Sequence, residues 1–231
     1  MNILVTGASR GIGKAICEIL GDNIYAAARS EDLLLSYENY CVCDLSTFEG
    51  IEKLGNYIVE NQIDVLINNA GGYIYSPIEE MNFAQIETIT RLDLIAPLYL
   101  IAKAVPYMKE KKNGRIINIG SISGVMGEAY ASAYSSAKSG LIGATKALAL
   151  ELAPYGITVN TINPGWVDTE MGNTSVIEGG FSKEEMIECI PQKRFVSSQE
   201  IAGMVKYLIS EPARGVTGQA INLCAGLTCG C

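Results

Sequence analysis

Short runs of β-branched and apolar residues alternate along the chain with longer segments of helical periodicity. Seven such runs predict strands, at residues 2–5, 24–28, 40–43, 65–67, 115–119, 158–162 and 220–223. Helices are expected between them, at residues 13–20, 48–61, 83–111, 134–153 and 199–210. Strands that alternate with helices pair in parallel and are covered on both faces. The pattern therefore predicts an α/β fold of three layers, with a doubly wound, seven-stranded parallel sheet and helices on both faces.

Nothing in the sequence divides the chain into separate domains. Its 231 residues are 48% hydrophobic and 18% charged, which suits one compact domain over residues 1–231. Residues 170–191 depart from the alternation: they are polar, include Gly179 and Gly180, and then carry a short amphipathic pattern through Met186, Ile187 and Ile190. We expect this segment to cover a bound substrate.

The complete absence of histidine excludes much of the usual catalytic chemistry. Without an imidazole there is no Ser/His/Asp relay and no HExxH zinc site. Any acid or base must be a tyrosine, lysine, cysteine or carboxylate side chain. Since 25 acidic residues outnumber 17 basic ones, for a net charge of −8, the composition also argues against nucleic acid as a partner.

Neither a membrane span nor a structural metal is predicted. The longest apolar run, residues 94–102, lies between Asp93 and Lys103 and is far shorter than the ~18 residues a span needs. The N-terminus lacks the basic and apolar regions of a signal peptide. The seven cysteines are odd in number and scattered, which favours reduced thiols, with a metal or redox role for Cys229 and Cys231 as the alternative. We expect a cytoplasmic protein.

A glycine-rich turn joins the first predicted strand to the first helix, in the sequence TGASRGIG of residues 6–13. Gly7, Gly11 and Gly13 allow the backbone to turn sharply and to approach a phosphate closely. The following helix presents unpaired N–H groups and the positive end of its dipole to an anion. The turn therefore predicts a site for the pyrophosphate of a dinucleotide.

The order and spacing of this turn and of later motifs resemble the classical short-chain dehydrogenase/reductase family, over nearly the whole chain. The later motifs are Asp44-Leu45, Asn68-Asn69-Ala70-Gly71, Ser121, the Tyr134/Lys138 pair and Asn163-Pro164-Gly165. The pattern is most similar to that of 3-oxoacyl-[acyl-carrier-protein] reductases. The resemblance implies a Rossmann-type sheet and hydride transfer between a nicotinamide and a carbonyl carbon.

Tyr134 and Lys138 are four residues apart on a predicted helix and therefore share one face. A nearby ammonium favours the phenolate and lowers the pKa of a tyrosine. In the family, the corresponding tyrosine is the general acid/base, the lysine lowers its pKa and holds the ribose, and a serine bonds the carbonyl oxygen. Ser121 has the spacing of that serine, and Ser123 is the alternative.

Asp93 departs from the family pattern, because an asparagine is expected at its position. Two roles are open for it. If the family's asparagine acts through its main-chain carbonyl, holding a water that reaches Lys138, an aspartate serves equally well. An ionised Asp93 could instead pair with Lys138 and alter its proton affinity.

The second strand is followed by Arg29, where dinucleotide folds that bind NAD carry an acidic residue. Together with Arg10 it offers two guanidinium groups to a 2′-phosphate, so NADP(H) is preferred over NAD(H). Neutralisation of Arg29 by Glu31 or Asp32 is the alternative. The resemblance implies a set of cofactor-binding residues: Gly7, Ser9, Arg10, Gly11, Ile12, Gly13, Arg29, Asp44, Leu45, Asn68, Ala70, Gly71, Tyr134, Lys138, Pro164, Gly165, Val167 and Thr169.

These features predict an NADPH-dependent oxidoreductase that reduces a ketone, such as a 3-oxoacyl thioester, to a secondary alcohol. The alternatives are an NAD-dependent alcohol or sugar dehydrogenase and a catalytically weak nicotinamide-binding sensor. Trp166 either lines the substrate pocket or serves in packing. The apolar faces of the segments 83–111 and 134–153, together with the family resemblance, indicate a homotetramer or homodimer.

Overall fold

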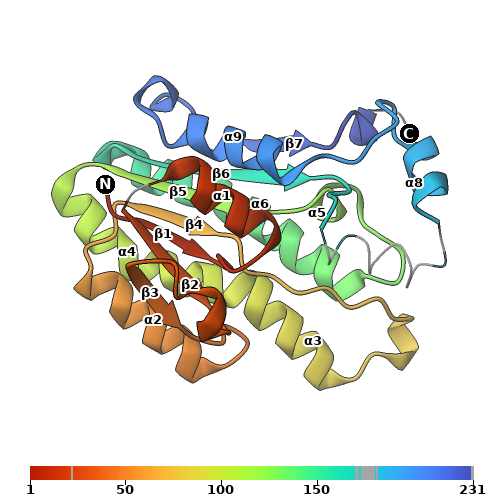
Figure 1. Cartoon of the computed structure of the whole chain (residues 1–231), viewed down its shortest axis with the longest axis horizontal. Helices are drawn as coiled ribbons and strands as arrows, with labels where there is room; N and C mark the ends of the chain where they lie inside the picture. The colour runs from red at the N-terminus through yellow and green to blue at the C-terminus, as the bar shows by residue number, and fades with distance from the viewer. Residues whose placement is uncertain (22, 170–171, 173–179, 181, 230–231) are drawn as a thin grey trace.

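The computed structural model describes residues 1–21, 23–169, 172, 180 and 182–229. Its sheet has the order β3-β2-β1-β4-β5-β6-β7, and every neighbouring pair is parallel. The strands are β1 (Ile3–Thr6), β2 (Ile24–Ala28), β3 (Asn39–Val42), β4 (Val65–Asn68), β5 (Gly114–Ile119), β6 (Ile157–Pro164) and β7 (Ala220–Leu223). The predicted α/β class and doubly wound seven-stranded sheet are confirmed (Figure 1).

Helices cover both faces of this sheet (Figure 1). They are α1 (Gly11–Leu20), α2 (Phe48–Glu60), α3 (Phe83–Thr90), α4 (Ala96–Lys111), α5 (Ser123–Met126), α6 (Ser132–Leu152), α8 (Lys183–Cys189) and α9 (Ser198–Leu208). Because side chains alternate along a strand, Ile3 and Val5 pack toward α1 and α9, whereas Leu4 packs toward α2 and α4. The result is two apolar cores with the sheet between them.

The predicted helix 83–111 is not continuous, which corrects that expectation. A π-helical turn, Arg91–Ile95, separates α3 from α4, and the Ala96 N–H bonds the carbonyl of Arg91. Pro97 explains part of the break, since it lacks the N–H that would bond the carbonyl of Asp93 in an α-helix. The turn leaves Asp93 fully buried in the middle of an otherwise half-exposed helix.

Residues 170–171, 173–179 and 181 of the expected covering segment 170–191 lie outside the described residues, as does Cys231. In its described part, the amphipathic pattern forms α8, which begins with a capping box between Ser182 and Glu185. Met186 and Ile187 pack partly against the core on the α1 side of the sheet, and Ile190 is buried there.

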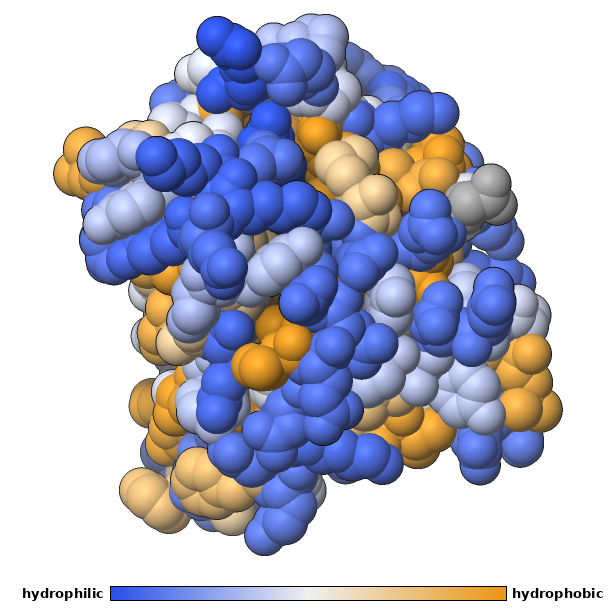
Figure 2. Space-filling view, turned by 90° about the vertical axis from the view of Figure 1, so that its left-hand side faces the viewer, coloured by the Kyte–Doolittle hydropathy of each residue, from blue (hydrophilic) through white to orange (hydrophobic). Residues whose placement is uncertain are grey.

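The side of the molecule in Figure 2 is largely hydrophilic, and its hydrophobic residues form small, separate patches. Among the described helices, none is both long and apolar enough to cross a bilayer.

Candidate active site

A pocket of about 530 Å³ opens at the carboxyl ends of the strands, where β1 lies between β2 and β4. This is the place where the strand order changes direction and where doubly wound sheets bind ligands. The loops after six strands line it, and they bring together most of the predicted site: Gly7, Ser9, Arg10, Gly11, Ile12, Arg29, Asp44, Leu45, Ala70, Gly71, Asp93, Ser121, Tyr134, Lys138, Pro164, Gly165, Val167 and Thr169.

Two of the predicted cofactor residues, Gly13 and Asn68, lie behind the pocket wall. A Cβ atom on Gly13 would stand 2.1 Å from the carbonyl oxygen of Gly7, so glycine is needed there for α1 to pack against the turn. Asn68 is buried and donates to Asn118 Oδ1 at 2.9 Å. Its neighbour Asn69 lines the pocket instead.

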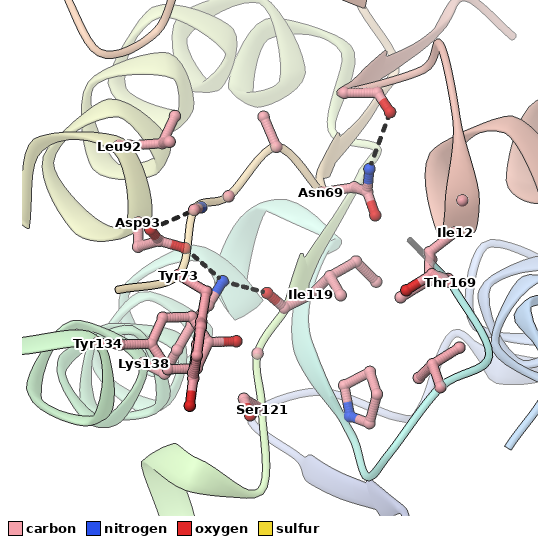
Figure 3. A pocket seen from close by; sticks show the side chains of 18 of the residues that line it. Ile12, Asn69, Tyr73, Leu92, Asp93, Ile119, Ser121, Tyr134, Lys138 and Thr169 are labelled. Atoms are coloured by element: carbon pink, nitrogen blue, oxygen red, sulfur yellow. Dashed lines mark hydrogen bonds and ion pairs between the residues drawn. The ribbon is translucent and has the colours of Figure 1, made fainter. Parts of the chain in front are cut away.

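The glycine turn is fixed by bonds to the end of β4. The Thr6 hydroxyl oxygen accepts from the Asn69 and Ala70 N–H groups, both at 2.9 Å. The Asn69 side chain in turn donates to the carbonyls of Thr6 and Gly7, at 2.9 and 3.2 Å. Figure 3 shows Asn69 and one of these bonds. Gly7 has a φ of 66°, which favours glycine. The turn thus holds the N-terminus of α1 against the pocket, an arrangement suited to a phosphate.

Arg29 and Asp44 lie at the pocket end formed by β2 and β3. Burial raises the pKa of Asp44, but hydrogen bonds from Ser46 and the charge of Arg29 outweigh it and hold the pKa below its usual value. Within the part of the chain that the structure describes, neither Glu31 nor Asp32 forms an ion pair with Arg29. The guanidinium is exposed at the pocket rim.

At the opposite end of the pocket, the ammonium of Lys138 is buried between two acceptors (Figure 3). It donates to the carbonyl of Ile119 at 3.0 Å and lies 2.9 Å from Asp93 Oδ1. The other oxygen of Asp93 accepts from the Gly72 N–H at 3.1 Å. Of the two roles left open for Asp93, the structure therefore shows the direct ion pair with Lys138.

Tyr134 lies beside this pair, with the Lys138 ammonium 5.6 Å from the centre of its ring. Burial raises the pKa of Tyr134, and this outweighs the lowering by the Lys138 charge and by a hydrogen bond with Ser121. Asp93 raises the pKa further, because its carboxylate offsets the ammonium. The lowering of this pKa by Lys138, as expected from the sequence, is therefore present, but burial outweighs it in the protein without a bound nicotinamide.

Lys138 and Asp93 also affect each other's pKa. Burial lowers the pKa of Lys138, but the negative charge of Asp93 and the Tyr134 hydroxyl raise it above its ordinary value. Burial raises the pKa of Asp93 against the opposing effect of Lys138.

Ser121 and Ser123 are linked to each other and to a carboxylate that the sequence did not reveal. Ser121 Oγ donates to Ser123 Oγ at 3.0 Å, and Ser123 Oγ donates to Glu128 Oε2 at 2.6 Å. The hydroxyl of Tyr73 donates to Glu128 Oε1 at 2.8 Å. Of the two serines, Ser121 is the one whose hydroxyl lowers the pKa of Tyr134.

Tyr73 and Glu128 are two polar side chains of the pocket that sequence reasoning missed. Tyr73 follows β4 by five residues and could have been placed at the carboxyl edge of the sheet. Glu128 follows Gly127, whose φ of 78° marks a turn, but no spacing rule indicates where its side chain points. Trp166 fits both of its alternatives, since it lines the pocket and stacks on Phe195 with ring centres 6.2 Å apart.

Within the described residues, no group of three or more cysteine and acidic side chains has the arrangement of a metal site. Cys17, Cys41, Cys43 and Cys224 are buried free thiols, whereas Cys189 and Cys229 are exposed.

Comparisons with known proteins agree with this arrangement. The family model described as short chain dehydrogenase matches residues 1–178. An uncharacterized oxidoreductase, YxjF of Bacillus subtilis, is 36% identical over 249 residues, covering 97% of both chains. The 3-oxoacyl-[acyl-carrier-protein] reductase FabG of Vibrio harveyi is 35% identical over 237 residues, covering 97% of this chain and 96% of its own.

Two solved structures superpose on nearly the whole chain. Actinorhodin polyketide ketoreductase with NADPH has a TM-score of 0.91 and 34% identity, with 97% of this chain and 96% of its own covered. 4-Hydroxyisoleucine dehydrogenase complexed with NADH has a TM-score of 0.91 and 29% identity, with 99% of each chain covered.

Proposed function

The chain belongs to the short-chain dehydrogenase/reductase family and is an NAD(P)-dependent oxidoreductase, and we propose that its reaction is the reduction of a ketone by NADPH. One observation carries the proposal. The pocket joins a phosphate-binding turn at one end to Ser121, Tyr134 and Lys138 at the other. A nicotinamide dinucleotide that extends between these ends brings its reactive ring to the three side chains.

The pocket residues fit such a cofactor. The glycine turn holds the N-terminus of α1 for the pyrophosphate, and the buried ammonium of Lys138 is one candidate to hold the ribose. The pocket residues proposed to contact the cofactor are Gly7, Ser9, Arg10, Gly11, Ile12, Arg29, Asp44, Leu45, Ala70, Gly71, Pro164, Gly165, Val167 and Thr169. Gly13 supports the turn from behind, and Asn69 takes the place expected of Asn68.

When bound, the reduced nicotinamide supplies the hydride. Ser121 then holds the carbonyl oxygen, and the hydroxyl of Tyr134 donates its proton to that oxygen as negative charge develops there. The raised pKa of Tyr134 supports the direction of reduction, because it keeps the phenol protonated and ready to donate. Lys138 opposes that rise and is kept in position by Asp93 and by the Ile119 carbonyl.

A preference for NADPH rests on Arg29 and Arg10. Both line the phosphate end of the pocket, and Arg29 has no acidic partner within ion-pair distance in the described residues. We expect Arg29→Ala to raise the KM for NADPH about tenfold or more and to change the KM for NADH little. Initial rates with both cofactors measure this, and an equal loss for both would overturn the preference.

A 3-oxoacyl thioester is the proposed substrate class. Its support is the likeness to relatives named 3-oxoacyl-[acyl-carrier-protein] reductase and to a polyketide ketoreductase. The site itself supports a ketone more broadly, since Ser121 and Tyr134 recognise only the carbonyl oxygen.

The direct test follows the absorbance of NADPH and NADH with a panel of ketones that includes an acetoacetyl thioester. We expect oxidation of NADPH by the thioester and a loss of at least about 100-fold in kcat for Tyr134→Phe, which cannot donate a proton. Tight NADPH binding without turnover of any ketone would favour a sensor. A clear preference for NADH and an alcohol would favour a dehydrogenase.

A further inference from the structure

The substrate end of the pocket contains a carboxylate that the proposed reaction does not use, that of Glu128. Glu128 lies in the loop between α5 and α6, after the turn at Gly127. In the sequence, Glu128 therefore lies between Ser121 and Tyr134.

Hydrogen bonds fix this carboxylate on both of its oxygens. Ser123 Oγ donates to Oε2 at 2.6 Å, and the Tyr73 hydroxyl donates to Oε1 at 2.8 Å. The backbone of Glu128 is fixed as well, because its N–H donates to Ser135 Oγ of α6 at 3.2 Å. A group held in this way keeps its position when a ligand enters, which is what a selective contact requires.

The carboxylate lies close to the place of the substrate carbonyl. Two consecutive hydrogen bonds, of 3.0 and 2.6 Å, connect Ser121 Oγ to Glu128 Oε2 through Ser123. On its other side, Tyr73 packs edge to face on Tyr134, with ring centres 5.2 Å apart (Figure 3). A ketone held by Ser121 and Tyr134 would therefore present its neighbouring substituent to Glu128.

No cation is paired with the Glu128 carboxylate among the described residues, where none of the lysines and arginines forms an ion pair with it. The nearby Lys138 ammonium is paired with Asp93. A carboxylate accepts about four hydrogen bonds, so Ser123 and Tyr73 leave acceptor capacity on both oxygens.

We propose that Glu128 is a specificity-determining residue. It accepts ketones with a neutral substituent beside the carbonyl, a 3-oxoacyl thioester among them, favours those that carry a hydrogen-bond donor there, above all a cationic ammonium, and rejects those that carry a carboxylate there. The inference rests on the proposed function for the ketone itself. A carboxylate in a pocket selects among ligands mainly by disfavouring anionic ones. Two negative charges at short range raise the free energy of the complex where water is excluded.

Three methyl ketones of nearly equal size provide the test: aminoacetone, which is cationic, hydroxyacetone, which is neutral, and pyruvate, which is anionic. Trp166, the single tryptophan of the chain, lines the pocket, so its fluorescence reports ketone binding to the NADP⁺-loaded protein without turnover. We expect aminoacetone to bind about tenfold or more tighter than pyruvate, with hydroxyacetone between them. The kcat/KM values with NADPH should follow the same order.

The variant Glu128→Gln removes the charge and nearly keeps the shape. It should bring the affinities for the three ketones to within about twofold of one another, while the affinity for NADPH stays unchanged. Glu110→Gln, which removes one negative charge from the exposed end of α4, is the matched control and should keep the order.

The outcomes separate this inference from the proposed function. Equal affinities in the parent protein, tighter binding of pyruvate, no binding of aminoacetone, or an unchanged order in Glu128→Gln would each overturn the role of Glu128. The expected order of binding without hydride transfer to any ketone would support Glu128 as the selective residue and overturn the reductase.

Discussion

At the scale of single residues, the ion pair between Asp93 and Lys138 distinguishes this site from the asparagine-containing pattern expected for the family. The pair is buried, and its atoms lie 2.9 Å apart. Its effect on Tyr134 is indirect: the carboxylate offsets part of the charge that would otherwise stabilise the phenolate. A protonated Tyr134 is thereby maintained to higher pH.

The variant Asp93→Asn tests this effect. Asparagine carries no charge, so the Lys138 ammonium would act on Tyr134 without an opposing carboxylate, and the pKa of Tyr134 would fall. Because reduction needs the protonated phenol, the loss of kcat/KM at alkaline pH should move to lower pH. The measurement is the pH profile of NADPH-dependent reduction from about pH 7 to about pH 11.

The matched control is again Glu110→Gln, which should leave the profile of the parent protein unchanged. An unshifted profile in Asp93→Asn, with activity retained, would show that Asp93 has no influence on the proton donor.

Some of the site residues could be predicted from the sequence and others could not. Tyr134 and Lys138 are four apart on one helix, and that spacing alone places them on one face. Ser121 follows a strand whose end lies at the same edge. Glu128 escaped prediction because its place depends on a loop conformation and on bonds to Tyr73 and Ser123, which are distant or unpatterned in the sequence.

At the scale of elements, the two glycines Gly13 and Gly143 lie in helices but differ in what surrounds them. A Cβ on Gly13 would stand 2.1 Å from the Gly7 carbonyl oxygen, whereas a Cβ on Gly143 would meet nothing within 4 Å. We expect Gly13→Ala to destabilise the protein by about 1–3 kcal/mol and to weaken NADPH binding about tenfold or more. Urea unfolding and NADPH titration measure the two effects.

Gly143→Ala is the matched control in the exposed part of α6. It should raise the free energy of unfolding by about 1 kcal/mol, since alanine loses less backbone entropy than glycine in a helix. If both variants bound NADPH with the same affinity, this would argue against a role of Gly7 and Gly13 in shaping the turn for the cofactor.

The start of α9 is stabilised by charge. Arg194 bonds both carboxylate oxygens of Glu200, at 2.8 and 2.9 Å, and Ser197 completes a capping box with Glu200. The Arg194 guanidinium lowers the pKa of Glu200 to about 2 from an ordinary value of 4.5. Because the pKa is lowered in the folded state, the stabilisation is present above pH 4.5 and is lost as the pH falls toward 2.

We therefore expect Glu200→Gln to lower the free energy of unfolding at about pH 7 by no more than about 1 kcal/mol, since solvent screens this partly exposed pair. The difference from the parent should shrink as the pH drops below 4.5. Urea unfolding at several pH values measures it. Glu18→Gln, in an exposed pair with Lys14, is the control that should change little. A difference for Glu200→Gln that is independent of pH would exclude this linkage.

The elements themselves were largely predictable, and the exception has a local cause. The strand runs are short, apolar and β-branched, and each predicted strand lies within two residues of an observed one. The π turn Arg91–Ile95 was not foreseen, because the apolar periodicity of residues 83–111 continues through it. Only the burial of Asp93 and the missing N–H of Pro97 show that the α-helical pattern breaks there.

At the scale of the whole molecule, α4, α6 and their neighbours carry apolar side chains on the surface. Leu150 is 82% exposed and Phe83 is 78% exposed, and Ile86, Ile95 and Leu98 are also accessible. Apolar side chains gathered on outer helices favour association with another chain. We propose that copies of this chain assemble through these helices as a homotetramer or homodimer.

Light scattering with gel filtration should then give a multiple of the monomer mass of 24.7 kDa. Leu150→Asp should reduce that mass, because a carboxylate would be buried between subunits without a partner. Leu35→Asp, at an exposed leucine far from these helices in the sequence, is the control and should leave the mass unchanged. A parent protein that elutes and scatters as a monomer would contradict the assembly.

The packing of α1 on α9 has a consequence for how the protein is made. Ala15 and Ile16 of the first helix share one core with Ile201 and Val205 of α9, nearly two hundred residues later in the chain. Until α9 has been synthesised, the apolar face of α1 lacks the partner that covers it. The nascent chain must therefore keep that face from aggregating until α9 emerges, and the turn at the start of α1 matures only after α9 has packed on this helix.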